Sequence, residues 1–280
     1  MRIELNNGLL RVQLDALGAE LKSVLRNGVQ YLWQGDAAVW KDTAPLLFPV
    51  VGRQCCFSYL LDGVRYEMPM HGFAKDSTFT VTRQSTAEAA LTLSADARTR
   101  AWYPFDFVLE SEFRLEGECL LVTRRVTNHG DRPMPFSIGE HPGYCISSAD
   151  SGAYLRFSCT EEEKRWVLDD EIIDHAEPFL YSDTLPITPT LFDRGALIFK
   201  NLRSKRVTLF RADGHTVCVE FDDWKHLGIW AKPNAPYICI EPWNGLASSK
   251  GSSEDIWEKE SIRKLLPGAH EQFTMTVRFR

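Results

Sequence analysis

Hydrophobic and polar residues alternate over long stretches of the chain, a pattern typical of strands that bury one face. Residues 105–116 place Phe105, Phe107 and further apolar side chains at most odd positions, with mainly charged residues between them. Residues 272–279 repeat this alternation at the end of the chain. We therefore predict two long strands, each with one face in the core.

Turn signals between such stretches predict tight hairpins. Asn-Gly occurs at positions 27–28, Asp-Gly at 62–63 and 213–214, and Glu-Gly at 116–117. Glycine, together with Asn or Asp, readily adopts the positive φ angles that two-residue hairpin loops require. The order of strands and turns therefore indicates antiparallel connections.

Helical patterns are few. Residues 95–102 predict two helical turns that Pro104 ends, and residues 253–263 predict a second helix with Ser253 as its N-cap. Neither alternates with strands in a βαβ order, which disfavours a parallel sheet. No linker, charge block or repeat divides the chain. The sequence predicts a single all-β domain over residues 1–280, a large antiparallel sandwich with few short helices.

The charge balance narrows the classes of partner. The 280 residues carry 32 Lys and Arg against 38 Asp and Glu, a net charge of −6, with no basic stripe. This argues against nucleic acid or an anionic membrane as a partner. The longest largely apolar run, residues 44–52, is shorter than the roughly 18 residues of a spanning helix. The charged first twenty residues lack the apolar core of a signal peptide, so we expect a cytoplasmic protein.

The cysteines and the absent motifs exclude several chemistries. Seven cysteines without a Cys-x-x-Cys pair are typical of reduced thiols. The chain has no Gly-x-Gly-x-x-Gly, no Walker-type loop and no Gly-x-Ser-x-Gly elbow, which disfavours nucleotide cofactors and α/β-hydrolase chemistry. His141 and Cys145 are four residues apart but do not make a tetrahedral metal set.

Four titratable or charged residues stand among apolar, proline and glycine neighbours, where an unpaired charge is costly. They are Arg53, His71, His141 and Glu241. Residues 237–243 predict a core strand that ends at Pro242. Alternation places Glu241 on the same face as Cys239 and Trp243. A carboxylate beside an indole face is typical of a sugar site.

Each of these residues also has a structural explanation. A single histidine in a loop, a salt-bridged glutamate at a strand end or an arginine clamp would be unremarkable. Two histidines, a glutamate and an arginine in similar settings favour a functional site more than any one of them does alone. Acid, base and charge stabiliser together suit proton-transfer chemistry.

Several segments resemble the aldose 1-epimerase (galactose mutarotase-like) superfamily, and most of all its bacterial aldose-1-epimerase-like branch. The segments are Phe-Pro-Val-Val-Gly-Arg53, Pro-Met-His71-Gly-Phe-Ala-Lys75, Gly-Glu-His141-Pro-Gly-Tyr and Cys-Ile-Glu241-Pro-Trp-Asn-Gly. Residues 102–107, 227–230 and 266–269 also fit, so the resemblance runs over nearly the whole chain in the family's order. It implies a β-supersandwich, no metal, no organic cofactor, and interconversion of the α and β anomers of an aldose.

The resemblance also implies catalytic roles. Glu241 would be the general base that takes the proton of the C1 hydroxyl, and His141 the general acid that protonates the ring oxygen. His71 and Arg53 would hydrogen-bond the oxygens near the anomeric centre. Ring opening, rotation about C1–C2 and closure from the other face need no covalent intermediate.

Further residues are expected around the sugar. Asp193, in Phe-Asp-Arg-Gly, matches an Asp that contacts sugar hydroxyls in the family, although a turn residue beside Gly195 explains it equally well. Most of the eight Trp, eight Tyr and sixteen Phe belong in the core. We expect Trp243, Phe73 and Tyr144 to line the sugar pocket.

Two residues depart from the family pattern. Glu140 stands where a small residue is expected, and we hypothesise that its carboxylate raises the pKa of His141. Strand alternation would instead point these neighbours apart. Lys75 stands where arginine is common, and together with Arg53 it would suit a phosphorylated sugar.

The sequence therefore predicts an isomerase acting at the anomeric carbon of a hexose, with a small-molecule sugar as its partner. Alternatives are a non-catalytic sugar-binding or sensing protein of the same fold, and an epimerase of a hexose 6-phosphate. A lyase or hydrolase on larger glycans is less favoured, because a hydrolase would be expected to use two carboxylates and only Glu241 is well placed. The preferred sugar and the oligomeric state, monomer or homodimer, stay open.

Overall fold

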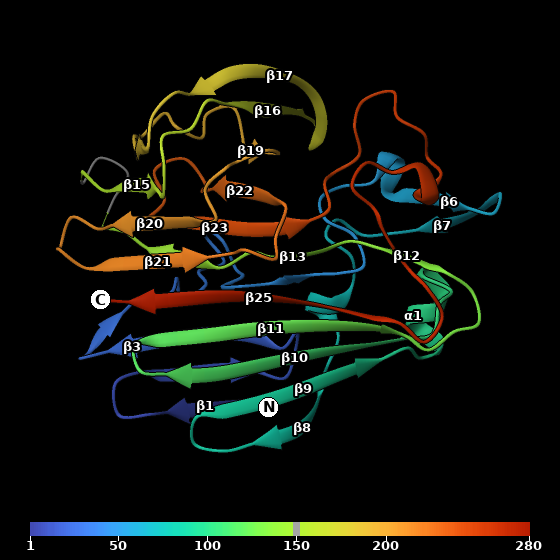
Figure 1. Cartoon of the computed structure of the whole chain (residues 1–280), viewed down its shortest axis with the longest axis horizontal. Helices are drawn as coiled ribbons and strands as arrows, with labels where there is room; N and C mark the ends of the chain where they lie inside the picture. Colours follow the sequence, from blue (N-terminus) through green and yellow to red (C-terminus); the bar gives the residue numbers. More distant parts are fainter. Residues whose placement is uncertain (148–151) are drawn as a thin grey trace.

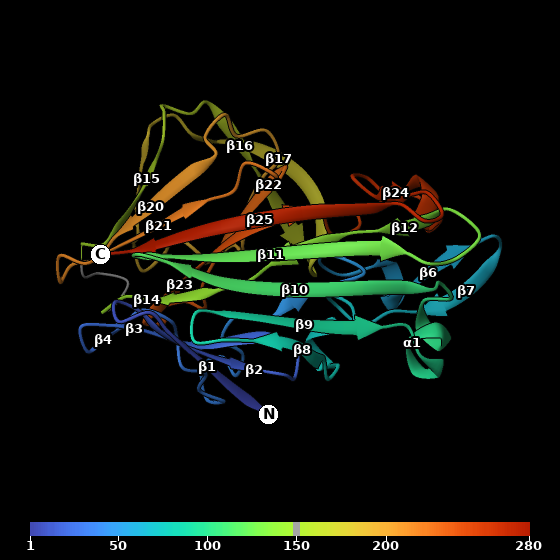
Figure 2. The same cartoon turned by 60° about the horizontal axis from the view of Figure 1, so that its bottom comes forward.

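Two large antiparallel sheets make up most of the computed structural model, which describes residues 1–147 and 152–280 (Figures 1 and 2). The first has nine strands in the order β18-β15-β20-β21-β25-β11-β10-β9-β8. Its strands are β8 (Thr80–Gln84), β9 (Glu88–Ser94), β10 (Phe107–Glu116), β11 (Cys119–Asn128), β15 (Tyr154–Phe157), β18 (Thr184–Pro186), β20 (Arg206–Phe210), β21 (Thr216–Glu220) and β25 (His270–Phe279).

The second sheet has eight strands in the order β17-β16-β19-β22-β23-β13-β5, with β14 paired to β23 off this path. Its strands are β5 (Leu46–Leu47), β13 (Ile138–Glu140), β14 (Gly143–Cys145), β16 (Glu163–Asp169), β17 (Ile172–Leu180), β19 (Leu197–Phe199), β22 (His226–Trp230) and β23 (Tyr237–Asn244). The all-β sandwich expected from the alternation is confirmed.

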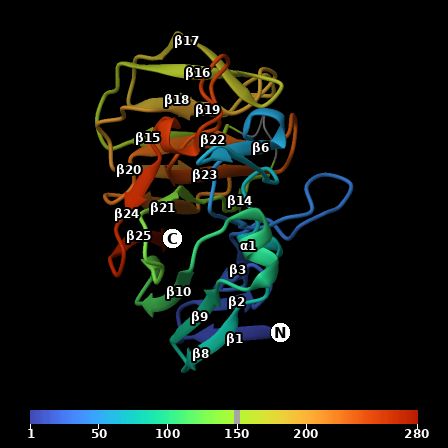
Figure 3. The ribbon, with the colours of Figure 1, turned by 90° about the vertical axis from the view of Figure 1, so that its right-hand side faces the viewer.

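Smaller sheets flank these layers. Four strands near the N-terminus form a meander that lies beside β8 and β9 at one end of the molecule (Figure 3). They are β1 (Arg2–Asn6), β2 (Arg11–Asp15), β3 (Glu20–Arg26) and β4 (Val29–Gln30). Two further pairs are β6 (Ser58–Leu61) with β7 (Val64–Glu67) and β12 (Met134–Phe136) with β24 (Arg263–Leu265). Within the described residues, no helix has the length and apolar character needed to span a membrane.

The predicted hairpins are present. The four turn signals connect β3 to β4, β6 to β7, β10 to β11 and β20 to β21, and each pair is antiparallel. In the β6–β7 turn, Asp62 and Gly63 have φ angles of 52° and 81°, as a turn of this kind requires. The two long predicted strands correspond to β10, which begins at Phe107, and to β25.

One helix prediction is confirmed and one is wrong. Helix α1 (Ala97–Trp102) begins after Asp96, whose side chain forms a reciprocal capping box with Thr99. Residues 253–263 instead contain a single 3₁₀ turn, Ile256–Glu258, capped by Asp255 and not by Ser253. The chain then extends to pair β24 with β12, so tertiary strand pairing overrides the local helical pattern. Two other 3₁₀ turns span Cys55–Phe57 and Ala74–Asp76.

Strand β23 does not end at Pro242, contrary to the prediction, and continues to Asn244. The N–H of Ile240 points to the oxygen of Pro142. The nitrogen of Pro242, two residues later, faces the same side. There the neighbouring chain is broken between β13 and β14. A missing N–H costs little at a gap in the ladder, so the proline is tolerated inside a central strand.

A buried ion pair joins the two sheets. Arg124 of β11 donates from Nε and Nη2 to the carboxylate of Glu140 on β13, at 2.6 and 2.9 Å. Both side chains are almost fully buried, and the guanidinium also lies over the ring of Phe113, 5.0 Å from its centroid. The bidentate geometry compensates each charge with the other.

Removing one partner of this ion pair should cost more than removing both. We expect Glu140→Leu to lower the free energy of unfolding by about 3–5 kcal/mol, because it leaves the Arg124 charge buried and unpaired. The double variant Arg124→Met/Glu140→Leu should recover most of that loss. Urea unfolding of the wild type, both single variants and the double variant checks this. A double variant no more stable than Glu140→Leu would contradict the pairing argument.

His226 is a second buried polar group, on β22. Its Nδ1 lies 3.1 Å from the carbonyl oxygen of Lys200, and its Nε2 lies 2.9 Å from the hydroxyl of Ser261. Burial lowers the pKa of His226 to about 4 from an ordinary value of 6.5, although the Lys200 carbonyl partly opposes the shift. The ring is therefore neutral in the folded protein at pH 7.

This depressed pKa predicts a loss of stability in acid. Below pH 6.5 the unfolded chain binds a proton at His226 that the folded chain does not bind until about pH 4. The contribution is complete above pH 6.5 and falls by up to about 3 kcal/mol as the pH drops through this window. His226→Asn, which keeps a donor near Lys200, should be less stable at pH 7. The difference should shrink toward pH 4.5 in urea titrations, and a pH-independent difference would contradict the prediction.

Candidate active site

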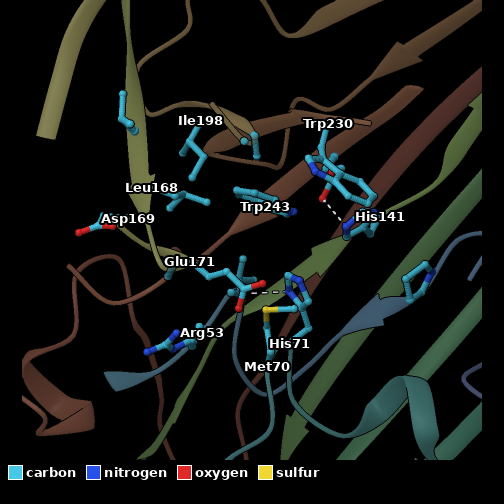
Figure 4. Close-up of a pocket in the computed structure, with 18 of the residues that line it drawn as sticks. Arg53, Met70, His71, His141, Leu168, Asp169, Glu171, Ile198, Trp230 and Trp243 are labelled. Atoms are coloured by element: carbon cyan, nitrogen blue, oxygen red, sulfur yellow. Dashed lines mark hydrogen bonds and ion pairs between the residues drawn. The ribbon is translucent and has the colours of Figure 1, made fainter. Parts of the chain in front are cut away.

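A cavity of about 990 Å³ opens beside β23 (Figure 4). Strands β22 and β23 supply one side of it, and the β16–β17 hairpin supplies another. Segments around residues 40–45, 51–53, 69–75 and 193–198 supply most of the remaining lining. The cavity therefore collects side chains from parts of the chain that lie far apart in the sequence.

Strand β23 is buried along its whole length, and its alternation places Glu241 toward the cavity. Trp243 lines the cavity as well, as the sequence predicted from the two-residue spacing. Cys239, two residues before Glu241, has its sulfur within 4.8 Å of ligand atoms of Glu241 and His141. One face of one strand thus carries a thiol, a carboxyl group and an indole.

Glu241 and His141 meet across the break between β13 and β14. The Nε2 atom of His141 lies 3.3 Å from Oε2 of Glu241. Both residues are buried, with 8% and 1% of their surface exposed. The sequence predicted both as site residues, and the structure brings them into direct contact.

Burial shifts the pKa values of this pair in opposite directions. It raises the pKa of Glu241 well above its usual range, against a smaller effect of the Trp243 indole. It lowers the pKa of His141 well below its usual value, and the neighbouring His71 adds to the shift. The pair is therefore favoured as a neutral carboxyl group beside a neutral imidazole. This form holds the same number of protons as a carboxylate beside an imidazolium.

His71 presents a fixed donor to the cavity. Its backbone has a positive φ of 66°, and its Nδ1 accepts the N–H of Gly52 at 3.1 Å. Burial and the charge of Lys75 lower the pKa of His71 to about 4. The ring is therefore neutral with its proton on Nε2. It meets the His141 ring edge to face, with centroids 5.6 Å apart.

Arg53 lines the cavity but is already engaged. Its Nη1 lies 2.6 Å from the carboxylate of Asp170 and donates to the Asp170 carbonyl at 2.7 Å. Its guanidinium also lies 4.7 Å from the ring centroid of Phe57. Asp170 stands between β16 and β17, so Arg53 ties this hairpin to the edge of the cavity. The clamp role considered for Arg53 from the sequence therefore has a named partner.

Two glycines make room for the indole of Trp243. Gly139 lies opposite Trp243 in the β13–β23 pair, and Gly228 lies opposite Glu241 in the β22–β23 pair. A Cβ atom at Gly139 would lie 2.5 Å from the indole, and one at Gly228 would lie 2.4 Å from it. The indole therefore lies over both neighbouring strands. Within the described chain, its Nε1 has no hydrogen-bond partner.

Two further tryptophans were not predicted as site residues. Trp40 stacks on the His141 ring, with centroids 5.2 Å apart, and Trp230 meets the same ring edge to face at 5.7 Å. Trp230 stands at the end of the segment 227–230 that carries the family resemblance. Trp40 lies in an irregular segment without periodicity, so no local pattern signals it. Glu20 anchors that segment by accepting the N–H groups of Thr43 and Ala44.

Two aromatic predictions are wrong. Phe73 and Tyr144 do not line the cavity and are almost fully buried in the main core. Phe73 packs against Phe107, with ring centroids 5.9 Å apart. Tyr144 lies opposite Ile238 in the β14–β23 pair, one position out of phase with Cys239. Period-two alternation therefore turns its ring into the core.

Asp193 and Lys75 both line the cavity. Asp193 is exposed and belongs to a turn in which its N–H bonds to the Thr190 carbonyl, so a turn position and a cavity position coincide. The ammonium of Lys75 lies 2.7 Å from the carboxylate of Asp76.

The hypothesis that Glu140 tunes His141 is wrong. Glu140 points into the sandwich core, where Arg124 holds its carboxylate, and the neighbouring His141 points into the cavity. The altered pKa of His141 arises from burial and from His71. Within residues 1–147 and 152–280, one group of three side chains has the spacing of metal ligands: His141, Cys239 and Glu241.

Comparisons with known proteins agree with one another. Residues 1–275 match the family model described as Aldose 1-epimerase. The plasmid and chromosomal forms of Protein LacX from Lactococcus lactis subsp. lactis are 31% and 30% identical to the chain, with 95% of both sequences covered in each case.

Solved structures show the same likeness. A galactose mutarotase related enzyme from Lactobacillus acidophilus has a TM-score of 0.96 at 28% identity, covering 100% of this chain and 97% of that one. A galactose mutarotase-like protein from Lactobacillus casei has a TM-score of 0.95 at 28% identity, with both chains covered completely.

The fit of Trp243 against Gly228 gives a structural prediction. Gly228→Ala should displace the indole and cost about 1–3 kcal/mol of stability by overpacking. ¹⁹F NMR of protein labelled with 5-fluorotryptophan should show the Trp243 resonance, assigned with Trp243→Phe, at a new position. Gly63→Ala is the control: Gly63 has a positive φ and open space around it, so its substitution adds strain without touching an indole. An unmoved Trp243 resonance in Gly228→Ala would contradict the steric argument.

Proposed function

Because the chain belongs to the aldose 1-epimerase family, we propose that Glu241 and His141 are the base and acid with which it interconverts the anomers of a hexose. Family membership makes the protein an isomerase that acts on carbohydrates. The observation that carries the assignment of residues is the buried 3.3 Å approach of the two side chains inside the cavity.

The geometry suits a hemiacetal. The anomeric hydroxyl and the ring oxygen are bonded to the same carbon, so a base and an acid that serve both atoms must lie side by side. Glu241 takes the proton of the C1 hydroxyl while Nε2 of His141 gives a proton to the ring oxygen, and the ring opens. Rotation about C1–C2 and the reverse proton transfers close the ring to the other anomer. Each step conserves protons within the pair and the sugar.

Burial favours the protonation form that Glu241 and His141 reach once the sugar ring has opened. Before ring opening the pair is a carboxylate beside an imidazolium, and afterwards it is a carboxyl group beside a neutral imidazole. The neutral form is the one that the pKa shifts of both residues favour. Forming the charged pair from the neutral pair costs free energy, and the double proton transfer to the sugar returns that cost. Each positioned acid or base contributes about 10²–10⁴ in rate, or roughly 3–5 kcal/mol.

The remaining cavity residues have supporting roles in this proposal. His71, neutral with its proton on Nε2, donates to an oxygen near the anomeric centre. Trp243 offers its indole face to the apolar side of the sugar ring. Arg53 orients the hairpin through Asp170, and Asp193 accepts from a hydroxyl at the edge of the cavity.

A neutral sugar fits better than a phosphorylated one. Two of the cations that line the cavity are already paired, Arg53 with Asp170 and Lys75 with Asp76. A phosphate would compete with these carboxylates for both cations. A purely sugar-binding protein is also disfavoured, because binding needs hydrogen bonds but no buried acid beside a buried base.

We also infer a cytoplasmic location and a single domain. All seven cysteines are free thiols, which supports a reducing compartment. One hydrophobic cluster includes residues from Ile3 to Phe279, which supports a single domain.

The proposal predicts which substitutions abolish turnover. Glu241→Gln and His141→Asn should each lower the rate of anomer exchange by about 10²–10⁴, because each removes one of the two proton-transfer groups. NMR exchange spectroscopy on equilibrated glucose and galactose measures the rate of anomer exchange in the presence of each variant.

His226→Asn is the matched control, since it changes a buried histidine on the neighbouring strand that does not line the cavity. It should keep its activity, and circular dichroism should show that every variant is folded. A folded Glu241→Gln variant with at least a tenth of the wild-type rate would sink the assignment.

A further inference from the structure

Cys239 places a thiol within the acid–base pair, where the proposed reaction does not use it. The strand positions Cys239 and Glu241 two residues apart on one face, and His141 reaches them from the break in the neighbouring chain. All three side chains are buried, and a nitrogen, a sulfur and an oxygen lie within 4.8 Å of one another. Three ligands of these types occur together in zinc sites of proteins.

The distances between the three ligand atoms are close to those around a tetrahedrally coordinated zinc ion. Zinc binds nitrogen at about 2.0–2.1 Å and carboxylate oxygen at about 2.0–2.2 Å, which holds the two atoms about 3.4 Å apart. The observed distance from Nε2 of His141 to Oε2 of Glu241 is 3.3 Å. The sulfur, bound at about 2.3 Å, would lie about 3.6 Å from each, so a movement of roughly 1 Å completes the set.

The charges also balance. A divalent ion enters while the thiol releases one proton and the carboxyl–imidazole pair releases another. A thiolate, a carboxylate, a neutral imidazole and Zn²⁺ sum to a net charge of zero. Burial therefore carries no penalty for net charge. Within the described residues, Oε2 of Glu241 makes no well-aligned hydrogen bond beside its 3.3 Å approach to Nε2 of His141, so ligation satisfies a buried polar atom.

We propose that His141, Cys239 and Glu241 bind Zn²⁺ reversibly, and that the ion switches off the epimerase by occupying its acid and base. The inhibitory part rests on the proposed function, whereas the binding part rests on geometry alone. Resident metal sites support each histidine ligand with a hydrogen bond to its other nitrogen. Within the described chain, Nδ1 of His141 has no such partner, which favours a dissociable ion over a permanent one.

Binding is tested directly with Co²⁺ as a spectroscopic substitute for Zn²⁺. Wild-type protein titrated with Co²⁺ should gain a thiolate-to-cobalt charge-transfer band and visible bands of tetrahedral intensity, saturating at one equivalent, and Zn²⁺ should abolish them. Cys239→Ala should lose the charge-transfer band. Cys145→Ala removes a half-buried thiol from the adjacent strand β14 and is the matched control, which should keep the band. No saturable band, or a band unchanged in Cys239→Ala, overturns the proposal.

Inhibition is tested by the ratio of exchange rates with and without Zn²⁺ within each variant, so that any change of basal rate cancels. Loss of an outer partner of a metal site costs about 10–100-fold in affinity, so loss of the Cys239 ligand should raise the inhibitory Zn²⁺ concentration by at least about 100-fold. Equal Zn²⁺ sensitivity of the wild type and Cys239→Ala overturns the proposal.

The two proposals fail separately. A Cys239-dependent cobalt band in a protein that exchanges no anomers would contradict the epimerase assignment and leave the metal site standing. Normal anomer exchange without the cobalt band would contradict the metal site and leave the epimerase assignment standing.

Discussion

The site depends on one strand that is buried on both faces. In β23 every residue is buried, and the strand lies between β22 and the broken β13–β14 segment. Alternation sends Ile238 and Ile240 into the sandwich core and leaves Glu241 facing the cavity. A carboxyl group in such a place must be neutral or paired, and His141 is its partner.

The neighbours of β23 are shaped around this requirement. The break between β13 and β14 lets His141 turn to Glu241 and accommodates Pro242, which has no N–H for the ladder. Glycines 139 and 228 leave room for an indole that lies over both adjacent strands. One residue before His141, the carboxylate of Glu140 turns the other way and binds Arg124 across the core. The contact between His141 and Glu241 and the ion pair that joins the two sheets therefore both depend on residues 139–141.

Much of the fold and part of the site could be predicted locally. Period-two patterns and positive-φ turn residues identify the hairpins, because both are properties of neighbours in sequence. The same alternation correctly joined Glu241 with Trp243. Tyr144 and Phe73, expected in the pocket, lie in the core instead. Residues 253–263 look helical in isolation, but pairing of β24 with β12 decides their conformation.

The sequence by itself determined the all-β class, the antiparallel connections and the identity of the acid–base candidates, since these follow from periodicity and from charges among apolar neighbours. Only the tertiary structure decided which atoms meet: His141 with Glu241 and Cys239, Arg53 with Asp170, and Trp40 with the His141 ring. These contacts join residues tens to hundreds of positions apart. Their distances are fixed by strand order and register across the whole sandwich, which no local pattern encodes.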